Sequence, residues 1–331
     1  MQLLPSGAVV VPDLAAPLVP IVQALGGAPA LWRSEPCAAD RPVLRRCRIV
    51  DAGDGFSTTS VSEDTRWLLH DRLMSALPTD GPMGHPVSPS LLDLKIELAQ
   101  SLLVPCRLCG RECGVDRRVT RGFCGLRDHL EIAAYAPLYN EGPLVGAPSF
   151  GVFLGGCALR CPFCYRPRQR RGKGLESDTP AALASVLDDA ADAGARSWHF
   201  LGGNPDESLP SVLAALRLTR REIPVVWNTA LTGSAQAFAL LKGVVDVWVV
   251  DLKVGSSSCE KSIGAFAGYA DWIRRRAQDL ADQPHVVVRH LLTPGHITCC
   301  TAPIRSFVRE VLPRHFVYVE LPLYPSTGAP R

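Results

Sequence analysis

The chain has 331 residues, of which 47% are hydrophobic and 20% are charged, and its net charge is +3. This composition is that of a folded globular protein and excludes a disordered chain. The small net charge provides no electrostatic argument for binding nucleic acid or a membrane surface, and we expect neither partner. No apolar run is long enough to cross a bilayer, and the first residues lack the pattern of a signal peptide, so we expect a cytoplasmic protein.

Residues 1–90 carry no motif with recognisable chemistry, and we interpret them as an N-terminal accessory region. A short strand is predicted over 7–11, a helix over 14–25, a second strand over 43–50 and an amphipathic helix over 63–77. The breaker-rich residues 78–86 then predict a linker. Either this region only packs on the rest of the chain, or it recruits a substrate or a partner.

A helix predicted over 90–103 leads into a cysteine-rich segment, and residues 91–148 are predicted to form a helix followed by a metal-binding knuckle. In a reducing compartment, cysteines at short spacing indicate metal ligation and not a disulfide framework. Four thiolates suit tetrahedral zinc or a fully ligated iron–sulfur cluster, and both remain open. The knuckle cysteines are Cys106, Cys109, Cys113 and Cys124.

From residue 149 onward, strands alternate with helices, which is typical of a parallel α/β fold. Strands are predicted over 151–154, 197–201, 224–228, 245–251, 285–290 and 316–321. Helices are predicted over 179–193, 210–220, 236–241, 269–281 and 303–311. Six βα steps are too few for an eight-stranded barrel, so residues 149–331 predict a partial (β/α)6 TIM-type barrel or a strongly curved open sheet.

Polar and metal-binding side chains follow the predicted strands, at the end where parallel α/β folds place their reactive groups. The first strand ends at three cysteines spaced C-x3-C-x2-C, which are Cys157, Cys161 and Cys164. The later strands end at Gly202, Gly203, Asn204 and Pro205, at Asn228, at Asp251 and Lys253, and at Arg289 and His290. A cubane cluster takes four ligands, so three cysteines indicate an open, reactive iron. A small molecule with amino and carboxylate groups could chelate that iron, with the basic residues meeting its carboxylate.

These motifs resemble those of the radical S-adenosylmethionine (SAM) superfamily. The cysteine spacing, with Phe163 before the last cysteine, resembles the cluster signature, and the Gly-Gly-Asn-Pro at 202–205 resembles a methionine-binding Gly-Gly-Glu-Pro. Asp251-Leu252-Lys253, the Val-Val-Trp-Asn at 225–228 and the Arg-His-Leu…Pro-Gly-His at 289–296 resemble uncharacterised homologues of pyruvate formate-lyase activating enzyme. The resemblance covers roughly residues 104–325.

The resemblance implies a [4Fe-4S] cluster on the three cysteines with SAM on the fourth iron. It implies reductive cleavage of SAM to a 5′-deoxyadenosyl radical, which abstracts a hydrogen atom from a substrate, and an external electron donor such as flavodoxin or ferredoxin. Two departures indicate a substrate other than that of the activating enzyme. Asn204 stands where an acidic residue is expected, and Tyr165-Arg166-Pro167-Arg168 follows the cysteines where homologues have a small amide residue.

Several residues keep two interpretations. Cys299 and Cys300 are either buried structural thiols or catalytic donors of a hydrogen atom to a substrate radical, and Cys259 shares that status. His296 is either structural or part of the site. A basic run is either a solvated loop or a docking site for an anion, and it consists of Arg166, Arg168, Arg170, Arg171 and Lys173.

Three functions remain open. The first is a radical SAM enzyme of oxidoreductase or isomerase type that acts on a small molecule or a peptide. The second is an activase that installs a glycyl radical on a partner protein, and the third is a non-catalytic iron–sulfur or zinc module. The extra 90 residues and the altered segment after the three cysteines favour the first.

Overall fold

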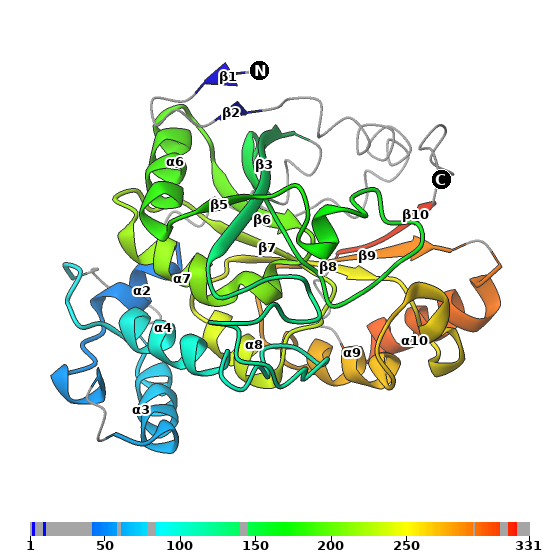
Figure 1. Ribbon diagram of the computed structural model, residues 1–331, viewed down its shortest axis with the longest axis horizontal. Helices are drawn as coiled ribbons and strands as arrows, with labels where there is room; N and C mark the ends of the chain where they lie inside the picture. Colours follow the sequence, from blue (N-terminus) through cyan, green and yellow to red (C-terminus); the bar gives the residue numbers. More distant parts are fainter. Residues whose placement is uncertain are drawn as a thin grey trace.

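The computed structural model describes residues 2–3, 9–10, 42–57, 61–77, 84–139, 145–293, 295–311 and 317–322. Its centre is one sheet with the strand order β1-β2-β3-β4-β6-β7-β8-β9-β10, and β5 pairs with β3 (Figure 1). The strands are β1 (Gln2–Leu3), β2 (Val9–Val10), β3 (Leu130–Leu138), β4 (Ser149–Leu154), β5 (Glu176–Asp178), β6 (Ser197–Gly202), β7 (Val225–Thr229), β8 (Val247–Leu252), β9 (Val286–Leu292) and β10 (Val317–Pro322).

The strands from β4 to β10 run parallel in that order, which confirms the predicted partial barrel. Figure 1 shows helices α7 to α10 along one side of the sheet. The connecting helices are α6 (Pro180–Asp192), α7 (Leu209–Leu218), α8 (Ala235–Leu241), α9 (Tyr269–Gln278) and α10 (Ala302–Val311). The antiparallel neighbour β3 was not predicted, because its alanines and Pro137 have low strand propensity and its pairing with β4 defines it.

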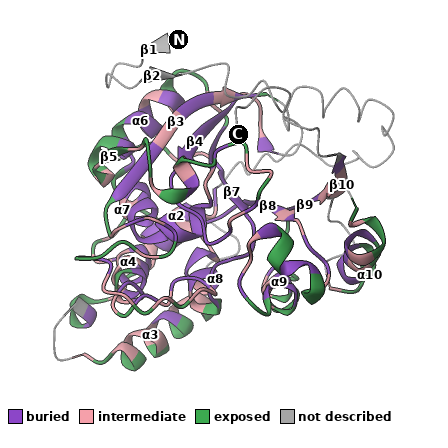
Figure 2. Ribbon diagram, turned by 45° about the vertical axis from the view of Figure 1, so that its right-hand side comes forward, coloured by how far each residue is buried: buried purple, intermediate pink, exposed green. Residues whose placement is uncertain are grey.

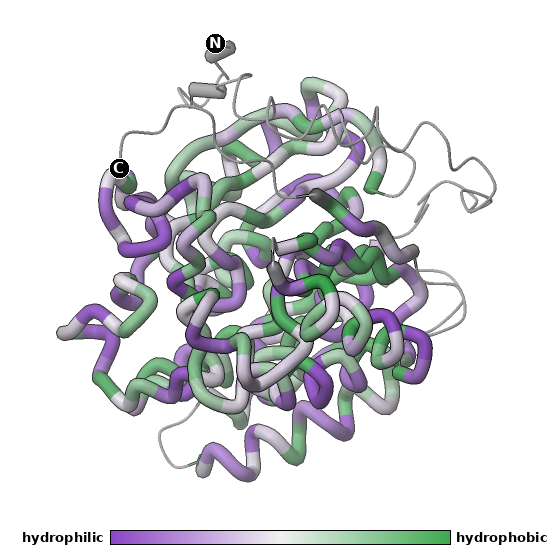
Figure 3. The backbone as a smooth tube through the Cα atoms, turned by 90° about the vertical axis from the view of Figure 1, so that its right-hand side faces the viewer, coloured by the Kyte–Doolittle hydropathy of each residue, from purple (hydrophilic) through white to green (hydrophobic). Residues whose placement is uncertain are grey.

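The two faces of the parallel strands have different partners, because successive side chains of a strand point to opposite faces. The outer face packs under the helices and includes Trp198, Trp227 and Trp248, which are fully buried. The inner face carries a separate cluster of valines, among them Val226 and Val249. Figure 2 shows the strands as the most continuously buried part of the fold, and Figure 3 shows the hydrophobic segments concentrated in its interior.

Besides β1, β2 and a 3₁₀ turn at Asp54–Ser57, the described N-terminal part contains α2 (Leu44–Ile49) and α3 (Glu63–Ser75), which pack on α4 (Leu91–Ser101). The strand predicted over 43–50 is therefore wrong. Leu44 and Cys47 lie three residues apart, so a helix buries both on one face, and Arg48 of the same helix bonds to Thr219 Oγ1 at 2.6 Å. The strand predicted over 7–11 corresponds to β2, whereas the helix predicted over 14–25 and part of the predicted linker lie outside the described residues.

Lys95 joins α4 to the barrel although its side chain is fully buried. Its ammonium group donates to the carbonyl oxygens of Leu240 (3.1 Å) and Lys242 (3.0 Å) at the end of α8, where a cation is favoured. His70 Nε2 lies 3.1 Å from the same nitrogen, and burial together with the Lys95 charge lowers the pKa of His70 to about 4. The neutral imidazole therefore accepts a hydrogen bond from Lys95. This buried cation fixes α3 and α4 against α8.

None of the described helices combines the length and apolar character needed to cross a bilayer.

Candidate active site

The cluster loop, residues 155–165, follows β4 and carries three of the predicted metal ligands. Cys157 and Cys161 are buried, and Cys164 is half-buried. Backbone hydrogen bonds tie the loop to distant segments: Gly156 N donates to Gln169 O, and Arg160 N donates to Gly264 O. Gly156 has a φ of +73°, a conformation that favours glycine. Backbone contacts therefore define the turn into the loop.

Three arginines donate hydrogen bonds to the carbonyl oxygens of this loop. Arg111 Nε donates to Ala158 O at 2.8 Å, Arg160 donates to Cys157 O at 2.7 Å, and Arg170 donates to Cys161 O. The guanidinium groups of Arg111 and Arg160 also lie 4.0 and 4.2 Å from the ring centre of Phe123. Three thiolates would bring three negative charges to this loop, and these guanidinium groups would offset them.

Gly202 and Gly203 at the end of β6 are needed for packing against the cluster loop. A Cβ atom on Gly202 would lie 2.6 Å from Leu154 N, and one on Gly203 would overlap Gly156 O and lie 2.9 Å from the carbonyl carbon of Gly155. Gly203 N donates to Leu154 O at 2.8 Å. The backbone of the cluster loop therefore approaches these glycines closely, which brings the end of β6 to the cysteines.

Asn204 is buried, and its amide group is hydrogen-bonded on both sides. Its Nδ2 donates to Glu207 Oε2 at 2.7 Å, and its Oδ1 accepts from Ala230 N at 2.9 Å. An acidic side chain here would face the carboxyl group of Glu207 and could not offer it an N–H donor. Asparagine supplies the donor instead, which explains why this position departs from the Gly-Gly-Glu-Pro pattern.

A buried acidic pair, Asp206 and Glu207, was missed by sequence reasoning. Both lie in the 3₁₀ turn Pro205–Ser208 directly after the glycine motif, and two adjacent acids at a strand end were the available signal. Glu207 Oε1 accepts from Ala158 N of the cluster loop at 3.2 Å and lies 2.7 Å from Thr232 Oγ1. Burial, followed by the charge of Asp206, raises the pKa of Glu207 to about 7. This carboxyl group joins the end of β6 to the cluster loop.

We expect Asp206→Asn to destabilise the fold by about 1–3 kcal/mol. Asp206 Oδ1 accepts from Trp227 Nε1 at 2.8 Å, and Oδ2 accepts from Gly233 N at 2.9 Å. In asparagine one of these two oxygens becomes an NH₂ group, which would face the N–H donor of Trp227 or Gly233 and lose that hydrogen bond. The thermal midpoint of the apoprotein measures the effect, with the exposed Asp192→Asn as the matched control. Equal midpoints for both variants would contradict the prediction.

The inner face of the sheet carries a polar network at the ends of β7, β8 and β9. Arg289 Nε donates to Asp251 Oδ1 at 2.7 Å, and another guanidinium nitrogen of Arg289 donates to Asn228 Oδ1 at 2.6 Å. Burial opposes ionisation of Asp251, but the charges of Arg289 and Lys253 lower its pKa to about 2. Three of the predicted strand-end residues therefore form one ionised, hydrogen-bonded group.

Lys253 connects this network to the cluster loop. Its Nζ lies 3.8 Å from Asp251 Oδ2, and its positive charge opposes the rise that burial causes in the pKa values of Cys157 and Cys161. The side chain is largely buried, with 14% of its surface exposed. Lys253 is thus the predicted carboxylate-binding residue that the structure places beside the cysteines.

His290 lies on the outer face of β9 and does not join this network. Its Nδ1 is 3.0 Å from Leu252 O and its Nε2 is 2.9 Å from Thr301 Oγ1, and burial lowers its pKa. Cys299 and Cys300 lie close to Cys259 beyond the end of β9, with the Cys259 and Cys299 sulfurs 3.4 Å apart. The prediction that they donate a hydrogen atom stays a prediction.

The cysteine knuckle docks directly against the cluster loop. Cys157 N donates to Cys124 O at 3.3 Å, and Gly110 N donates to Thr232 O at 2.9 Å. A Cβ atom on Gly122 would lie 3.4 Å from Cys124 Sγ and 3.5 Å from Cys113 Sγ, so these thiols converge on one glycine. Burial is the main cause that raises the pKa values of Cys106, Cys109 and Cys124. As free thiols they are protonated at neutral pH, and a bound metal would convert them to thiolates.

Part of the basic run is structural. Arg170 bonds to the cluster loop, and Arg166 is buried with its guanidinium 4.4 Å from the ring centre of Phe153 on the inner face. Arg168 and Arg171 are exposed. The interpretation of the basic run as a solvated loop is therefore wrong for Arg166 and Arg170.

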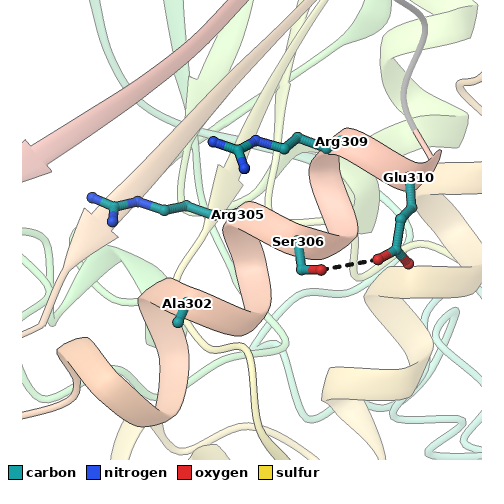
Figure 4. A pocket seen from close by; sticks show the side chains of 5 residues that line it. All are labelled: Ala302, Arg305, Ser306, Arg309 and Glu310. Atoms are coloured by element: carbon teal, nitrogen blue, oxygen red, sulfur yellow. Dashed lines mark hydrogen bonds between the residues drawn. The ribbon is translucent and has the colours of Figure 1, made fainter.

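A shallow hollow on α10 is separate from this site (Figure 4). It is lined by one helical stretch, and Ser306 Oγ donates to Glu310 Oε1 at 2.9 Å across it. Arg305 is paired with Glu320 at 2.6 Å. No strand-end residue lines the hollow, so it contributes nothing to the site.

Comparisons with known proteins agree with the motifs. Residues 152–297 match the family model of the Radical SAM superfamily. Over 306 residues the chain is 29% identical to uncharacterized protein MJ0674 of Methanocaldococcus jannaschii. This alignment covers 89% of this chain and 88% of that protein. It is 27% identical over 114 residues to PqqA peptide cyclase of Granulibacter bethesdensis, covering 34% of this chain and 30% of the cyclase.

Two further matches are also partial. The chain is 29% identical over 99 residues to 7-carboxy-7-deazaguanine synthase of Aquifex aeolicus, covering 29% of this chain and 43% of the synthase. The solved structure of Streptococcus suis SuiB bound to S-adenosylmethionine has a TM-score of 0.39 and 17% identity, covering 54% of this chain and 38% of SuiB. This chain therefore spans less than half the length of the cyclase, the synthase and SuiB.

Proposed function

We propose that this chain, which contains a radical SAM domain over residues 152–297, is a radical SAM enzyme that acts on a peptide or a small molecule. The observation that carries the proposal is the position of Cys157, Cys161 and Cys164. They lie at the end of the first parallel strand, on a loop held by three arginines and beside Lys253. A cytoplasmic location belongs to the same proposal, because the free thiols need a reducing compartment.

The cofactors of the superfamily are a [4Fe-4S] cluster and SAM, and the cluster loop fits the cluster. Its three cysteines can each bind one iron and leave the fourth iron of a cubane without a protein ligand. When bound, the reduced cluster supplies the electron that cleaves SAM to methionine and a 5′-deoxyadenosyl radical, which takes a hydrogen atom from the substrate.

The residues of this chain hold and orient the reactants. We propose that Lys253 binds the carboxylate of SAM, and that the Asn228–Asp251–Arg289 network keeps the strand ends rigid beneath it. The buried Asp206 and Glu207 fix the loops around the cluster and do not touch SAM. The knuckle is proposed as an auxiliary metal site of zinc or iron–sulfur type that supports the same loop.

The test is anaerobic reconstitution with iron and sulfide, followed by dithionite and SAM. We expect 5′-deoxyadenosine and methionine to form in equal amounts. We propose flavodoxin or ferredoxin as the external electron donor, and either protein should support the same reaction when it replaces dithionite. A protein that assembles a cluster but leaves SAM intact would contradict the proposal and favour a non-catalytic iron–sulfur module.

The glycyl-radical activase is the second candidate function, and it rests on the Asp-Leu-Lys and Arg-His-Leu motifs alone. It predicts a partner enzyme that gains a glycyl radical signal in electron paramagnetic resonance. The peptide cyclase and the deazaguanine synthase among the relatives instead support a peptide or a small molecule as substrate.

We expect Lys253→Met to weaken SAM binding roughly 10- to 100-fold, because a hydrogen bond to a charged group contributes about 1.5–3 kcal/mol. Lys253→Arg should retain most of the affinity, since it keeps the charge. The dissociation constant for SAM on the reconstituted protein measures the effect. The exposed Lys261→Met is the matched control, and equal affinities for both methionine variants would remove Lys253 from the proposed site.

A further inference from the structure

A second group of metal-binding side chains lies away from the cluster loop, at the ends of β8 and β9. Cys259 comes from the 3₁₀ turn Ser257–Ile263 after β8. After β9, His296 directly precedes the π-helical turn Ile297–Thr301, and Cys299 and Cys300 lie within that turn. One ligand atom from each of these four residues lies within 4.8 Å of every other. Within the described part of the chain, this is the one such group found for a single ion. We refer to these four residues as the CHCC site.

The distances among Cys259, Cys299 and His296 lie within about 0.4 Å of those between ligands of one tetrahedral zinc ion. Zn–S bonds of about 2.3 Å and Zn–N bonds of about 2.0 Å place two sulfurs about 3.8 Å apart and a sulfur and a nitrogen about 3.5 Å apart. Here the Cys259 and Cys299 sulfurs are 3.4 Å apart. His296 Nδ1 lies 3.3 Å from the Cys259 sulfur and 3.5 Å from the Cys299 sulfur. Three sulfurs and one imidazole are a common ligand set of structural zinc.

The backbone around the CHCC site is shaped to bring these residues together. A π-helical turn is rare and occurs mostly at functional sites, and here it lets the adjacent Cys299 and Cys300 both approach Cys259. Gly255 presses against this turn, since a Cβ on it would overlap Cys300 O and lie 3.2 Å from its carbonyl carbon. On the other side, the buried His290 bonds to Thr301 of the turn at 2.9 Å.

Burial of the CHCC site suits a bound ion. Cys259 and Cys300 are 6% and 2% exposed, whereas His296 and Cys299 are half-buried, so an ion can enter from one side and is shielded on the others. Thiols are weak hydrogen-bond partners, and three of them gathered beside an imidazole gain little from one another without a metal.

We propose that the CHCC site binds one zinc ion that joins the loop after β8 to the turn after β9. All four positions would be filled by protein, which is the mark of a structural zinc and not of a catalytic one. One of the two segments that it joins begins with Lys253 after β8, and the other follows β9, which carries Arg289. The ion would therefore hold this edge of the candidate active site in place while touching neither SAM nor the cluster.

The test is the metal content of the full-length protein, purified anaerobically and freed of loosely bound ions. We expect Cys259→Ser to lose about one zinc ion per chain relative to the wild type. His296→Cys should keep it, because four donors remain, and so should Cys47→Ser, whose thiol lies alone against Gly243 O. Iron content should be the same in all four proteins, so the result does not depend on SAM cleavage.

Cobalt(II) provides a second, spectroscopic readout of the same site. In the wild type and His296→Cys, Co²⁺ should give intense thiolate-to-metal absorption that Zn²⁺ abolishes. In Cys259→Ser the absorption should be lower than in the wild type by the contribution of one bound cobalt ion. Equal zinc in the wild type and Cys259→Ser would overturn the proposal. A Cys259–Cys299 disulfide without zinc, or a loss of iron in place of zinc, would overturn it as well.

Discussion

Cys161→Ser is expected to abolish formation of 5′-deoxyadenosine. Cys161 is the central cysteine of the cluster loop, and its carbonyl oxygen is already held by Arg170, so the substitution removes a ligand without freeing the loop. Loss of a residue that merely supports a metal ligand typically costs roughly 10- to 100-fold in metal affinity or activity, and loss of the ligand should cost more. The measurement is 5′-deoxyadenosine formed from SAM and dithionite, together with the visible absorption of the reconstituted cluster.

The control for this experiment is Cys47→Ser, which removes a buried thiol of α2 that donates to Gly243 O. We expect it to assemble the cluster and cleave SAM as the wild type does. Iron analysis adds a second readout, because any iron that Cys161→Ser retains would belong to the knuckle. Unchanged SAM cleavage by Cys161→Ser would exclude the cluster loop as the reactive site.

Gly203→Ala is expected to have the second largest effect, by displacing the cluster loop. The added Cβ would overlap Gly156 O and lie 2.8 Å from the Gly156 carbonyl carbon, and these are backbone atoms that cannot rotate away. Overpacking of this kind typically costs about 1–3 kcal/mol and sometimes more. We expect a lower thermal midpoint of the apoprotein and a clear loss of cluster occupancy, because the shifted residues lie next to Cys157.

Gly84→Ala is the matched control, since Gly84 is exposed and nothing lies within 4 Å of the position that its Cβ would take. It should match the wild type in thermal midpoint and in cluster content. If Gly203→Ala also matched the wild type, the close contact between the ends of β4 and β6 would not be needed to form the site.

Much of the fold was predictable because parallel strands with buried faces appear as short apolar runs. The six predicted barrel strands differ from the observed ones by a few residues at their ends, and Thr179 and Pro180 marked the start of α6 as expected. The failures have identifiable causes. β3 exists because β4 pairs with it, and α2 was assigned as a strand because arginines are mixed with apolar residues over 43–50.

The candidate site was predictable only in part. Strand ends of a parallel sheet meet at one edge, so Asn228, Asp251 and Arg289 could be expected near one another, and their hydrogen bonds agree. The sequence did not show which face of the sheet each of these side chains occupies. His290 follows Arg289 directly in the sequence, yet the alternation of side chains puts it on the opposite face.

The sequence by itself determined the likeness to the radical SAM superfamily and the fold class: the spacing of Cys157, Cys161 and Cys164 and the alternation of strands with helices are local patterns, which can be seen without knowing how distant segments pack. Only the tertiary structure decided which residues share a site. Glu207 meets the cluster loop, and Cys259 meets His296 across 37 residues, because of how loops after different strands pack together. Such contacts depend on the register and twist of the whole sheet, and no short stretch of sequence encodes them.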